Sequence, residues 1–303
     1  MASRELQLVI QLCRFSRRRR GPSVIELGRS AELRAEYDEI ASRNPLPSGV
    51  SYRPANAEGI SAEWLTGPDM DANRAILYLH GGCYSSGSVE THRDLMARLA
   101  IESSMRVLGL NYRLAPMYPF PAAVEDATAA YRWLLRIGLE PHRIAIGGDS
   151  AGAGLALAAT IAARDGGFPL PGAIVCLSPW VDLAVTGVSM GTKAREDPIV
   201  SREMLLGWGK LYLADHDPRT PLASPLYADL RQLPPMLIQV GSSEVLLDDS
   251  TRLAKRASAA DVDITLEVWP EMIHVWQAFA PILPEARQAI QIIGRFIRKH
   301  LHD

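Results

Sequence analysis

A serine between glycines is the side chain in this sequence best placed to act as a nucleophile. Ser150 stands in the segment Gly148-Asp149-Ser150-Ala151-Gly152, which fits the pattern G-x-S-x-G. A short apolar run precedes the segment, and a helix-like run of small and apolar residues follows it. A sharp strand-to-helix turn needs small neighbours two residues either side of the serine, and it leaves the hydroxyl exposed. We therefore predict that Ser150 is a nucleophile at such a turn, rather than part of a simple glycine-rich loop.

A histidine that follows Ser150 in the chain is needed as its base, because a serine hydroxyl is a weak nucleophile until its proton is taken. Four histidines qualify: His216, His274, His300 and His302. The last two sit in a terminal helical tail, and His216 lies in an aspartate-rich turn. His274 comes just after the last predicted strand, and sites in open α/β sheets lie beyond the carboxyl ends of the strands. We expect His274 to be the base.

The carboxylate that holds this histidine should follow the preceding predicted strand, at 235–240. Glu244 lies in the loop after that strand, while Asp248 and Asp249 fall one turn into the next helix. The loop position favours Glu244, with Asp248 as the alternative. In a purely structural interpretation, Glu244 would be an acidic residue stabilised by the dipole at a helix N-terminus.

Two glycines are candidates for stabilising a negatively charged carbonyl oxygen. Acyl transfer develops such a charge, and preorganised N–H groups stabilise it. Gly81 and Gly82 follow the predicted strand at 75–80, and their N–H groups together with that of Ala151 would form an oxyanion hole. His80 is expected to brace this loop rather than to act as a base.

The elements that must position these residues alternate between strand and helix. We expect strands at 50–53, 59–65, 75–80, 106–111, 143–147, 172–177, 235–240 and 264–269, and helices at 90–102, 122–136, 155–164, 201–213, 246–259 and 284–301. Repeated strand–helix units form a mostly parallel sheet with helices on both faces. The predicted class is therefore α/β.

Two segments are expected to form a helical cap over the catalytic domain, which spans 48–303. Residues 1–47 look helical, with Leu6, Ile10, Leu12 and Phe15 on roughly helical spacing and a second helix at about 30–42. The segment at about 185–222 interrupts the strand–helix rhythm, and long excursions in such folds are often lids. Three aromatic residues are candidates to line an acyl pocket or to form the core of the cap: Tyr84, Trp208 and Tyr212.

Composition and charge exclude several classes of protein. The formal net charge is −2, so the chain has no positive electrostatic field that would attract nucleic acid or anionic lipid. No metal-ligand spacing and no phosphate-binding loop is present, which argues against a metal site and against a bound phosphate group. The three scattered cysteines, Cys13, Cys83 and Cys176, argue against a disulfide framework and for a reducing compartment, the cytoplasm.

Stable insertion into a membrane is not expected either. No apolar run reaches the length of a membrane span. The basic run at 17–20 follows an apolar stretch, whereas a secretory signal carries its charges first. An amphipathic helix with a solvated arginine tail is favoured over a helix lying on a lipid surface.

Taken together, the motifs resemble those of the hormone-sensitive lipase-like esterases, the bacterial family IV carboxylesterases. From residue 76 onward the matching segments are His80-Gly81-Gly82, Tyr112-Arg113-Leu114-Ala115-Pro116, Gly148-Asp149-Ser150-Ala151-Gly152, Ser178-Pro179-Trp180-Val181-Asp182 and Ser224-Pro225-Leu226. The resemblance implies an α/β-hydrolase fold with a helical cap and no cofactor. It also implies hydrolysis of small-molecule esters with short to medium acyl chains and, in many members, a homodimer. The strand near Ile264 is a candidate interface.

The sequence departs from this family at three positions. Cys83 stands where the oxyanion loop has a third glycine, and we expect its side chain to pack. Glu244-Val245-Leu246 stands where Asp-Pro-Leu is usual, so the acid is a glutamate. Met117 replaces a glutamate, which removes a local ion pair.

The resulting hypothesis is a carboxylesterase that works by a Ser150–His274–Glu244 triad and an acyl-enzyme intermediate. An amidase or peptidase with the same triad is an alternative, because the nucleophilic machinery is shared. A true lipase acting at oil–water interfaces is another. A third is a non-catalytic small-molecule receptor on the same fold; gibberellin receptors resemble these esterases but lack the catalytic histidine, and His274 is present here.

Overall fold

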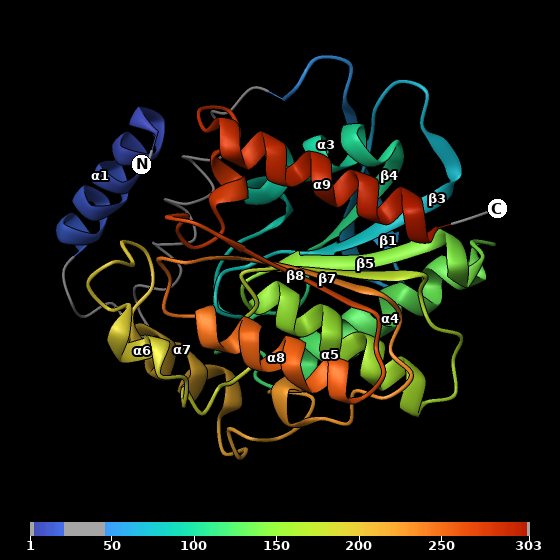
Figure 1. Cartoon of the computed structure of the whole chain (residues 1–303). Coiled ribbons are helices and arrows are strands. Elements are labelled where there is room, and N and C mark those ends of the chain that lie inside the picture. The colour runs from blue at the N-terminus through green and yellow to red at the C-terminus, as the bar shows by residue number, and fades with distance from the viewer. Residues whose placement is uncertain (1–2, 21–45, 302–303) are drawn as a thin grey trace.

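The computed structural model describes residues 3–20 and 46–301 (Figure 1). The second N-terminal helix expected at about 30–42 lies outside the described residues. Within them, the strands are β1 (Ser51–Ala57), β2 (Ile60–Thr66), β3 (Asp71–Leu79), β4 (Met105–Leu110), β5 (Ile144–Asp149), β6 (Ala173–Leu177), β7 (Met236–Gly241) and β8 (Ile264–Trp269).

These strands form one eight-stranded sheet in the order β1-β2-β4-β3-β5-β6-β7-β8. The pairings of β2 with β1 and with β4 are antiparallel. All pairings from β4 to β8 are parallel, so the carboxyl ends of β3, β5, β6, β7 and β8 meet at one edge of the sheet. The predicted mostly parallel sheet is confirmed.

Helices cover both faces of the sheet. The helices of the described residues are α1 (Arg4–Arg20), α3 (Val89–Ser103), α4 (Ala122–Arg136), α5 (Ala151–Asp165), α6 (Ser189–Thr192), α7 (Arg202–Leu213), α8 (Leu247–Ala259) and α9 (Pro284–His300), with 3-10 turns at Pro141–Arg143, Pro225–Tyr227 and Trp276–Phe279. In Figure 1, α3 and α9 lie above the sheet, and α4, α5 and α8 lie below it.

The central strands are largely apolar because both of their faces are buried. Every residue of β5, β6 and β7 is buried, as expected for parallel strands between two helical layers. Along β3, Leu77 and Leu79 belong to the core on the α4–α5 side, whereas Ile76 and Tyr78 belong to the core on the α3–α9 side. Successive side chains of β3 thus point to opposite faces of the sheet and pack into the two cores in turn.

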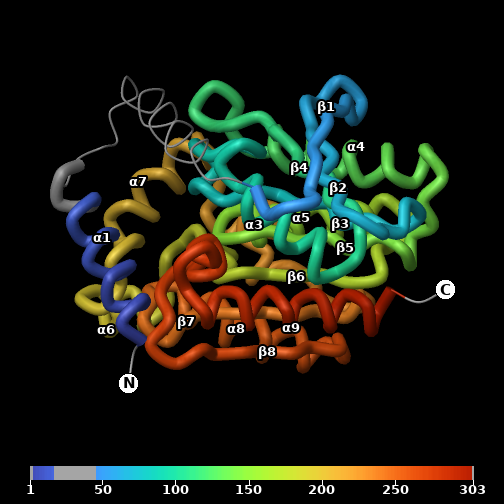
Figure 2. Tube along the Cα trace, turned by 90° about the horizontal axis from the view of Figure 1, so that it is seen from above, coloured from blue at the N-terminus to red at the C-terminus, as the bar shows by residue number. Residues whose placement is uncertain are grey.

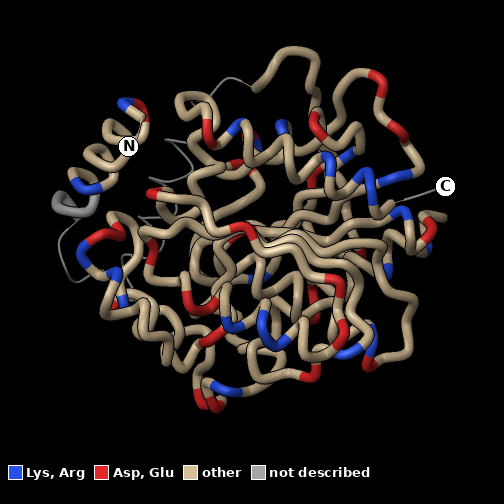
Figure 3. The backbone as a smooth tube through the Cα atoms, viewed as in Figure 1, with Lys and Arg blue, Asp and Glu red and all other residues tan. Residues whose placement is uncertain are grey.

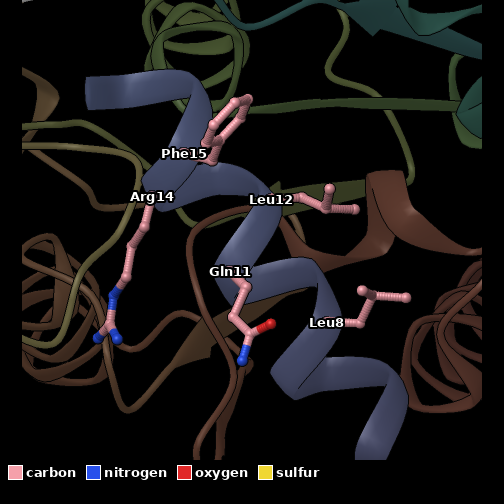
Figure 4. Close-up of a pocket in the computed structure, with 5 residues that line it drawn as sticks. All are labelled: Leu8, Gln11, Leu12, Arg14 and Phe15. Atoms are coloured by element: carbon pink, nitrogen blue, oxygen red, sulfur yellow. The ribbon is translucent and has the colours of Figure 1, made fainter. Parts of the chain in front are cut away.

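The N-terminal helix α1 lies at the same end of the molecule as α6 and α7 (Figures 1 and 2). Leu6 and Val9 are buried, whereas Leu12 and Phe15 are exposed. Of the apolar residues on helical spacing, Leu6 thus lies on the buried face, which Val9 rather than Leu12 continues. The exposed side bears a shallow pocket lined by Leu8, Gln11, Leu12, Arg14 and Phe15 (Figure 4).

Charged residues of both signs are interspersed over the described part of the backbone (Figure 3). This distribution fits the small net charge of the sequence. Among the described helices, none is both long enough and apolar enough to cross a membrane.

Candidate active site

Ser150 occupies the turn between β5 and α5. Its backbone has φ 54° and ψ −121°, and positive φ at a residue other than glycine is strain that gathers at functional sites. A Cβ atom on Gly148 or Gly152 would lie 2.2 or 2.0 Å from the Leu79 carbonyl oxygen. The two glycines of the motif therefore allow the turn to pack against the end of β3, as the sequence predicts.

His274 and Glu244 meet although they are 30 positions apart in the sequence. Glu244 follows β7 and is fully buried, and His274 follows β8. The Nδ1–H of His274 donates a hydrogen bond of 2.8 Å to Glu244 Oε2. Burial disfavours the charged imidazole, but the hydrogen bond and the charge of Glu244 outweigh burial and raise the pKa of His274. Such a pair can orient a base and stabilise its protonated form.

The second carboxylate oxygen of Glu244 is held by two donors. The Ser178 hydroxyl donates to Oε1 at 2.9 Å, and the Gly241 N–H donates to it at 2.5 Å. Ser178 Oγ also accepts from the Val275 N–H at 3.1 Å. One serine at the carboxyl end of β6 therefore links the loop of the acid to the loop of the histidine. This role of Ser178 is not predicted from the sequence above, although its place at a strand end was a usable signal.

Asp248, the alternative acid, has a different partner. Its Oδ2 accepts from the Ser189 N–H at 2.9 Å, and its own N–H donates to Ser189 Oγ at 3.0 Å. Asp249 is also engaged elsewhere, since it accepts from the N–H groups of Val181 and Asp182. Of the three acidic residues considered, Glu244 is the one against the histidine.

The loop with the two predicted oxyanion donors is tied to the residue before the nucleophile. The Gly81 N–H donates to Asp149 Oδ1 at 3.0 Å, and the Tyr78 hydroxyl donates to the same oxygen at 2.7 Å. His92 Nε2 lies 3.3 Å from Asp149 Oδ2. Because the Gly81 N–H already has a buried acceptor, the arrangement favours Gly82 and Ala151 over Gly81 as oxyanion donors.

Ala151 is the first residue of α5, where N–H groups have no acceptor within the helix. Gly82 has φ 114°, and a Cβ atom there would lie 2.1 Å from the Ser86 carbonyl oxygen. Only glycine fits this conformation. Ala151 therefore has a backbone N–H that no residue of its own helix accepts, and Gly82 has a conformation that a larger residue would not adopt.

Comparisons with known proteins identify the family of this chain. A family model described as alpha/beta hydrolase fold matches residues 76–278. The acetyl-hydrolase of Streptomyces hygroscopicus is 47% identical over 298 residues, which are 98% of this chain and 97% of that protein. The crystal structure of an esterase from the bacterial hormone-sensitive lipase family is 49% identical, covers all of both chains and has a TM-score of 0.95. The chain belongs to the hormone-sensitive lipase-like carboxylesterases.

The predicted α/β-hydrolase fold and the predicted family of this carboxylesterase are thus confirmed. An esterase of Acinetobacter venetianus is a further relative, 37% identical over 278 residues that make up 91% of each chain. Together with the solved esterase structures, these relatives show that the protein is a serine carboxylic ester hydrolase.

His80 braces the loop of the carboxylesterase that is predicted to bind the oxyanion. Its ring stacks on Tyr112 with centroids 4.3 Å apart, and its Nδ1–H donates to the Gly81 carbonyl oxygen at 2.7 Å. The Tyr112 hydroxyl donates to the His80 carbonyl oxygen at 2.6 Å. Burial, aided by the nearby His92, lowers the pKa of His80 to about 3. The imidazole is therefore neutral, which suits a structural role.

Cys83, which replaces the third glycine of the family motif, is buried in the core with φ 56°. Burial raises the pKa of its thiol to about 12. A protonated, buried thiol is a poor nucleophile, so Cys83 packs as a small apolar residue.

The three aromatic candidates lie in one core. Tyr84 stacks on Tyr212 with ring centroids 3.8 Å apart and an interplanar angle of 5°. Tyr212 and Trp208 lie on α7, and all three side chains are at most 8% exposed. The predicted cap insertion of the esterase therefore packs directly on the loop after β3, which carries Tyr84 and the predicted oxyanion donors.

Proposed function

We propose that this carboxylesterase hydrolyses esters with short to medium acyl chains by a Ser150–His274–Glu244 triad and an acyl-enzyme intermediate. The observation that carries the proposal is the 2.8 Å hydrogen bond between His274 and the buried Glu244. It joins the loops after β7 and β8, while Ser150 stands in the strained turn after β5.

In the first step, Ser150 attacks the ester carbonyl while His274 Nε2 takes the hydroxyl proton. Glu244 holds the opposite ring nitrogen and stabilises the imidazolium that forms. The N–H groups of Gly82 and Ala151 stabilise the oxyanion of the tetrahedral intermediate. Gly81 contributes indirectly, since its N–H anchors the loop to Asp149.

His274 then gives its proton to the leaving alcohol, and the acyl group remains on Ser150. In the second step, His274 takes a proton from a water molecule, which attacks the acyl carbonyl of the acyl-enzyme. His274 then returns the proton to Ser150, the bond between the acyl group and Ser150 breaks, and the carboxylic acid leaves the site. Peptide mapping by mass spectrometry after reaction with a p-nitrophenyl phosphonate tests the nucleophile. The phosphonyl group should sit on the peptide with Ser150, and labelling at any other serine would reject the proposal.

The cap and the acyl pocket belong to the same proposal. Residues 185–222 and the N-terminal segment 1–47 would cover the site, which the common position of α1, α6 and α7 at one end of the molecule supports (Figure 2). The stacked pair of Tyr84 and Tyr212 would close the far end of the acyl pocket. The relative from Streptomyces hygroscopicus is named an acetyl-hydrolase, which favours a short acyl chain. A rate profile over p-nitrophenyl esters of increasing chain length tests this point.

Amide hydrolysis by the same triad is the second candidate activity. The triad geometry serves both reactions, and the esterase and acetyl-hydrolase names of the relatives favour esters. Rates on matched ester and amide substrates decide between them, and a higher kcat/KM on the amide would overturn the proposal.

We further propose that the enzyme works in the cytoplasm as a homodimer. The buried Cys83 and Cys176 are free thiols, which suits a reducing compartment. β8 forms one edge of the sheet, with Val268 42% exposed, and offers a surface for a second copy. Light scattering on the purified protein tests the dimer, and a monomer at micromolar concentration would reject it.

A further inference from the structure

The residue next to the proposed catalytic acid is held on both sides by the cap insertion. The Val245 N–H donates to Asp197 Oδ2 at 2.9 Å. The Ser189 hydroxyl donates to the Val245 carbonyl oxygen at 2.5 Å. Val245 is fully buried, and Asp197 and Ser189 are each 2% exposed. Two buried side chains of the insertion thus pair with both backbone polar groups of one residue in the acid loop.

Asp197 is itself fixed before it meets this loop. Its Oδ1 accepts from the N–H groups of Ile199 and Val200 at 2.9 and 2.8 Å. Hydrogen bonds to a buried carboxylate are charge-assisted and stronger than those between neutral groups. The position of Asp197 Oδ2 is therefore set by the insertion, and the loop with Val245 must align with it.

Ser189 extends the contact to the start of α8. Its Oγ accepts from the Asp248 N–H at 3.0 Å, and its own N–H donates to Asp248 Oδ2 at 2.9 Å. The acid loop is thus bonded to the insertion at Val245 and again at Asp248. Glu244 lies directly before these two attachment points.

We propose that Asp197 and Ser189 are positioning residues, which clamp the acid loop so that Glu244 can orient His274 only when the insertion is docked. The proposal rests on the triad proposed above. A catalytic constellation needs its partners within about 0.5 Å of the productive geometry. The Glu244 side chain accepts from Ser178, Gly241 and His274, and its backbone carbonyl oxygen accepts from the Leu247 N–H at 3.3 Å. The N–H and the carbonyl oxygen of the next residue, Val245, are held by Asp197 and Ser189 of the insertion.

Asp197 also acts on the histidine through its charge. After burial and the contributions of Glu244, the negative charge of Asp197 is a further influence that raises the pKa of His274, followed by Asp149. Removal of the Asp197 charge should therefore lower the pKa of His274. The Ser189 hydroxyl carries no charge, so its removal should leave the pKa of His274 unchanged.

The first test is Asp197→Asn, with Asp182→Asn as its matched control. Asp182 is another fully buried carboxylate beside the insertion, which holds Thr186, Tyr227 and Arg252 but not the acid loop. For Asp197→Asn, kcat on p-nitrophenyl butyrate should fall about 10- to 100-fold. The acidic limb of kcat/KM should move to lower pH. Asp182→Asn should leave that limb unchanged, and an equal shift in both variants would overturn the proposal.

The second test is Ser189→Ala, with Thr192→Ala as control. Thr192 is on the same short helix, but its hydroxyl donates to the Val188 carbonyl oxygen and not to the acid loop. Ser189→Ala should lower kcat about 5- to 20-fold with KM within about threefold and no shift of the acidic limb. If Asp197→Asn fails to fold, Ser189→Ala alone tests whether the insertion clamps the acid loop. A kcat within about twofold of wild type would overturn the clamp.

Glu244→Gln, measured in parallel, separates the two proposals. If it loses activity while Asp197→Asn and Ser189→Ala keep theirs, the triad stands and the clamp is rejected. If Glu244→Gln keeps wild-type activity, the triad itself fails.

Discussion

Ser178 donates a hydrogen bond of 2.9 Å to Glu244, from the end of one strand to the loop after the next. The same hydroxyl oxygen accepts from the N–H of Val275, which follows His274 in the sequence. His274 and Glu244 are thus joined twice, once directly and once through Ser178. The proposed triad is held by the carboxyl ends of adjacent parallel strands rather than by any single loop.

Ser178→Ala should therefore weaken catalysis without removing a reacting group. The change leaves the buried Glu244 Oε1 with one donor fewer, and a lost buried hydrogen bond costs about 1–3 kcal/mol of stability. We expect a lower Tm and a kcat that falls about tenfold. Calorimetry and steady-state kinetics measure both. Thr160→Ala is the control, because it removes another buried hydroxyl, one that donates to the Ala156 carbonyl oxygen within α5. An equal loss of kcat in both variants would contradict a role for the Ser178 hydrogen bond.

Glu244→Gln and Asp248→Asn distinguish the two acidic residues that the sequence left open. Glutamine cannot stabilise an imidazolium as a carboxylate does, so kcat should fall by about 10²- to 10⁴-fold. Asp248→Asn keeps an acceptor for the Ser189 N–H and should stay within about threefold of wild type. Initial rates on p-nitrophenyl butyrate provide the comparison. A larger loss from the Asp248 substitution would reverse the assignment.

Activity should depend on pH through His274, which must be neutral to accept the serine proton. Glu244 raises the pKa of this histidine against the effect of burial. Activity should consequently rise with pH through a value above the ordinary pKa of histidine and reach a plateau beyond it. A kcat/KM profile over pH measures the limb. A midpoint below the ordinary value would contradict a histidine stabilised in its charged form.

Stability should depend on pH through Asp249, a buried carboxyl outside the triad. Burial raises its pKa from 3.8 to about 8; the Val181 N–H opposes the shift, the charge of Asp182 adds to it, and Arg252 opposes it. The folded state therefore holds a proton that the unfolded chain releases. Because a raised folded pKa means that the native state binds more protons, stability falls as pH rises through this interval.

Asp249→Asn should remove this fall, so the Tm of the variant relative to wild type should increase as the pH rises toward about 8. Differential scanning fluorimetry across pH measures it. Asp229→Asn is the control, since hydrogen bonds with Arg231 lower the pKa of the exposed Asp229 and keep it ionised throughout. A constant Tm difference for the Asp249 variant would contradict the prediction.

Much of the fold, and Ser150 and His274 of the candidate site, could be predicted from the sequence because their signals are local. The glycines around Ser150 and the place of His274 after a strand are visible within a few residues. The strand at 264–269 and the helix at 122–136 were expected with the bounds that β8 and α4 have in the structure.

The rest depends on contacts between distant segments. No local sequence pattern predicts that Asp197 accepts a hydrogen bond from Val245, which is 48 positions away in the sequence. None predicts that the Gly81 N–H donates to Asp149, which is 68 positions away. On α1, the choice of Val9 over Leu12 for the buried face is set by what the helix packs on, which helical spacing alone does not contain. Side-chain polar contacts of this kind follow from the tertiary arrangement and were therefore missed.

The central claim is that Ser150 is the nucleophile of an ester hydrolase, and the rate of the Ser150→Ala variant tests it most directly. Hydrolysis of p-nitrophenyl butyrate by wild type and by Ser150→Ala should be measured side by side, with circular dichroism and Tm to show that both are folded. The variant should lose about 10³- to 10⁶-fold in kcat. A folded variant with activity near that of wild type would contradict the account.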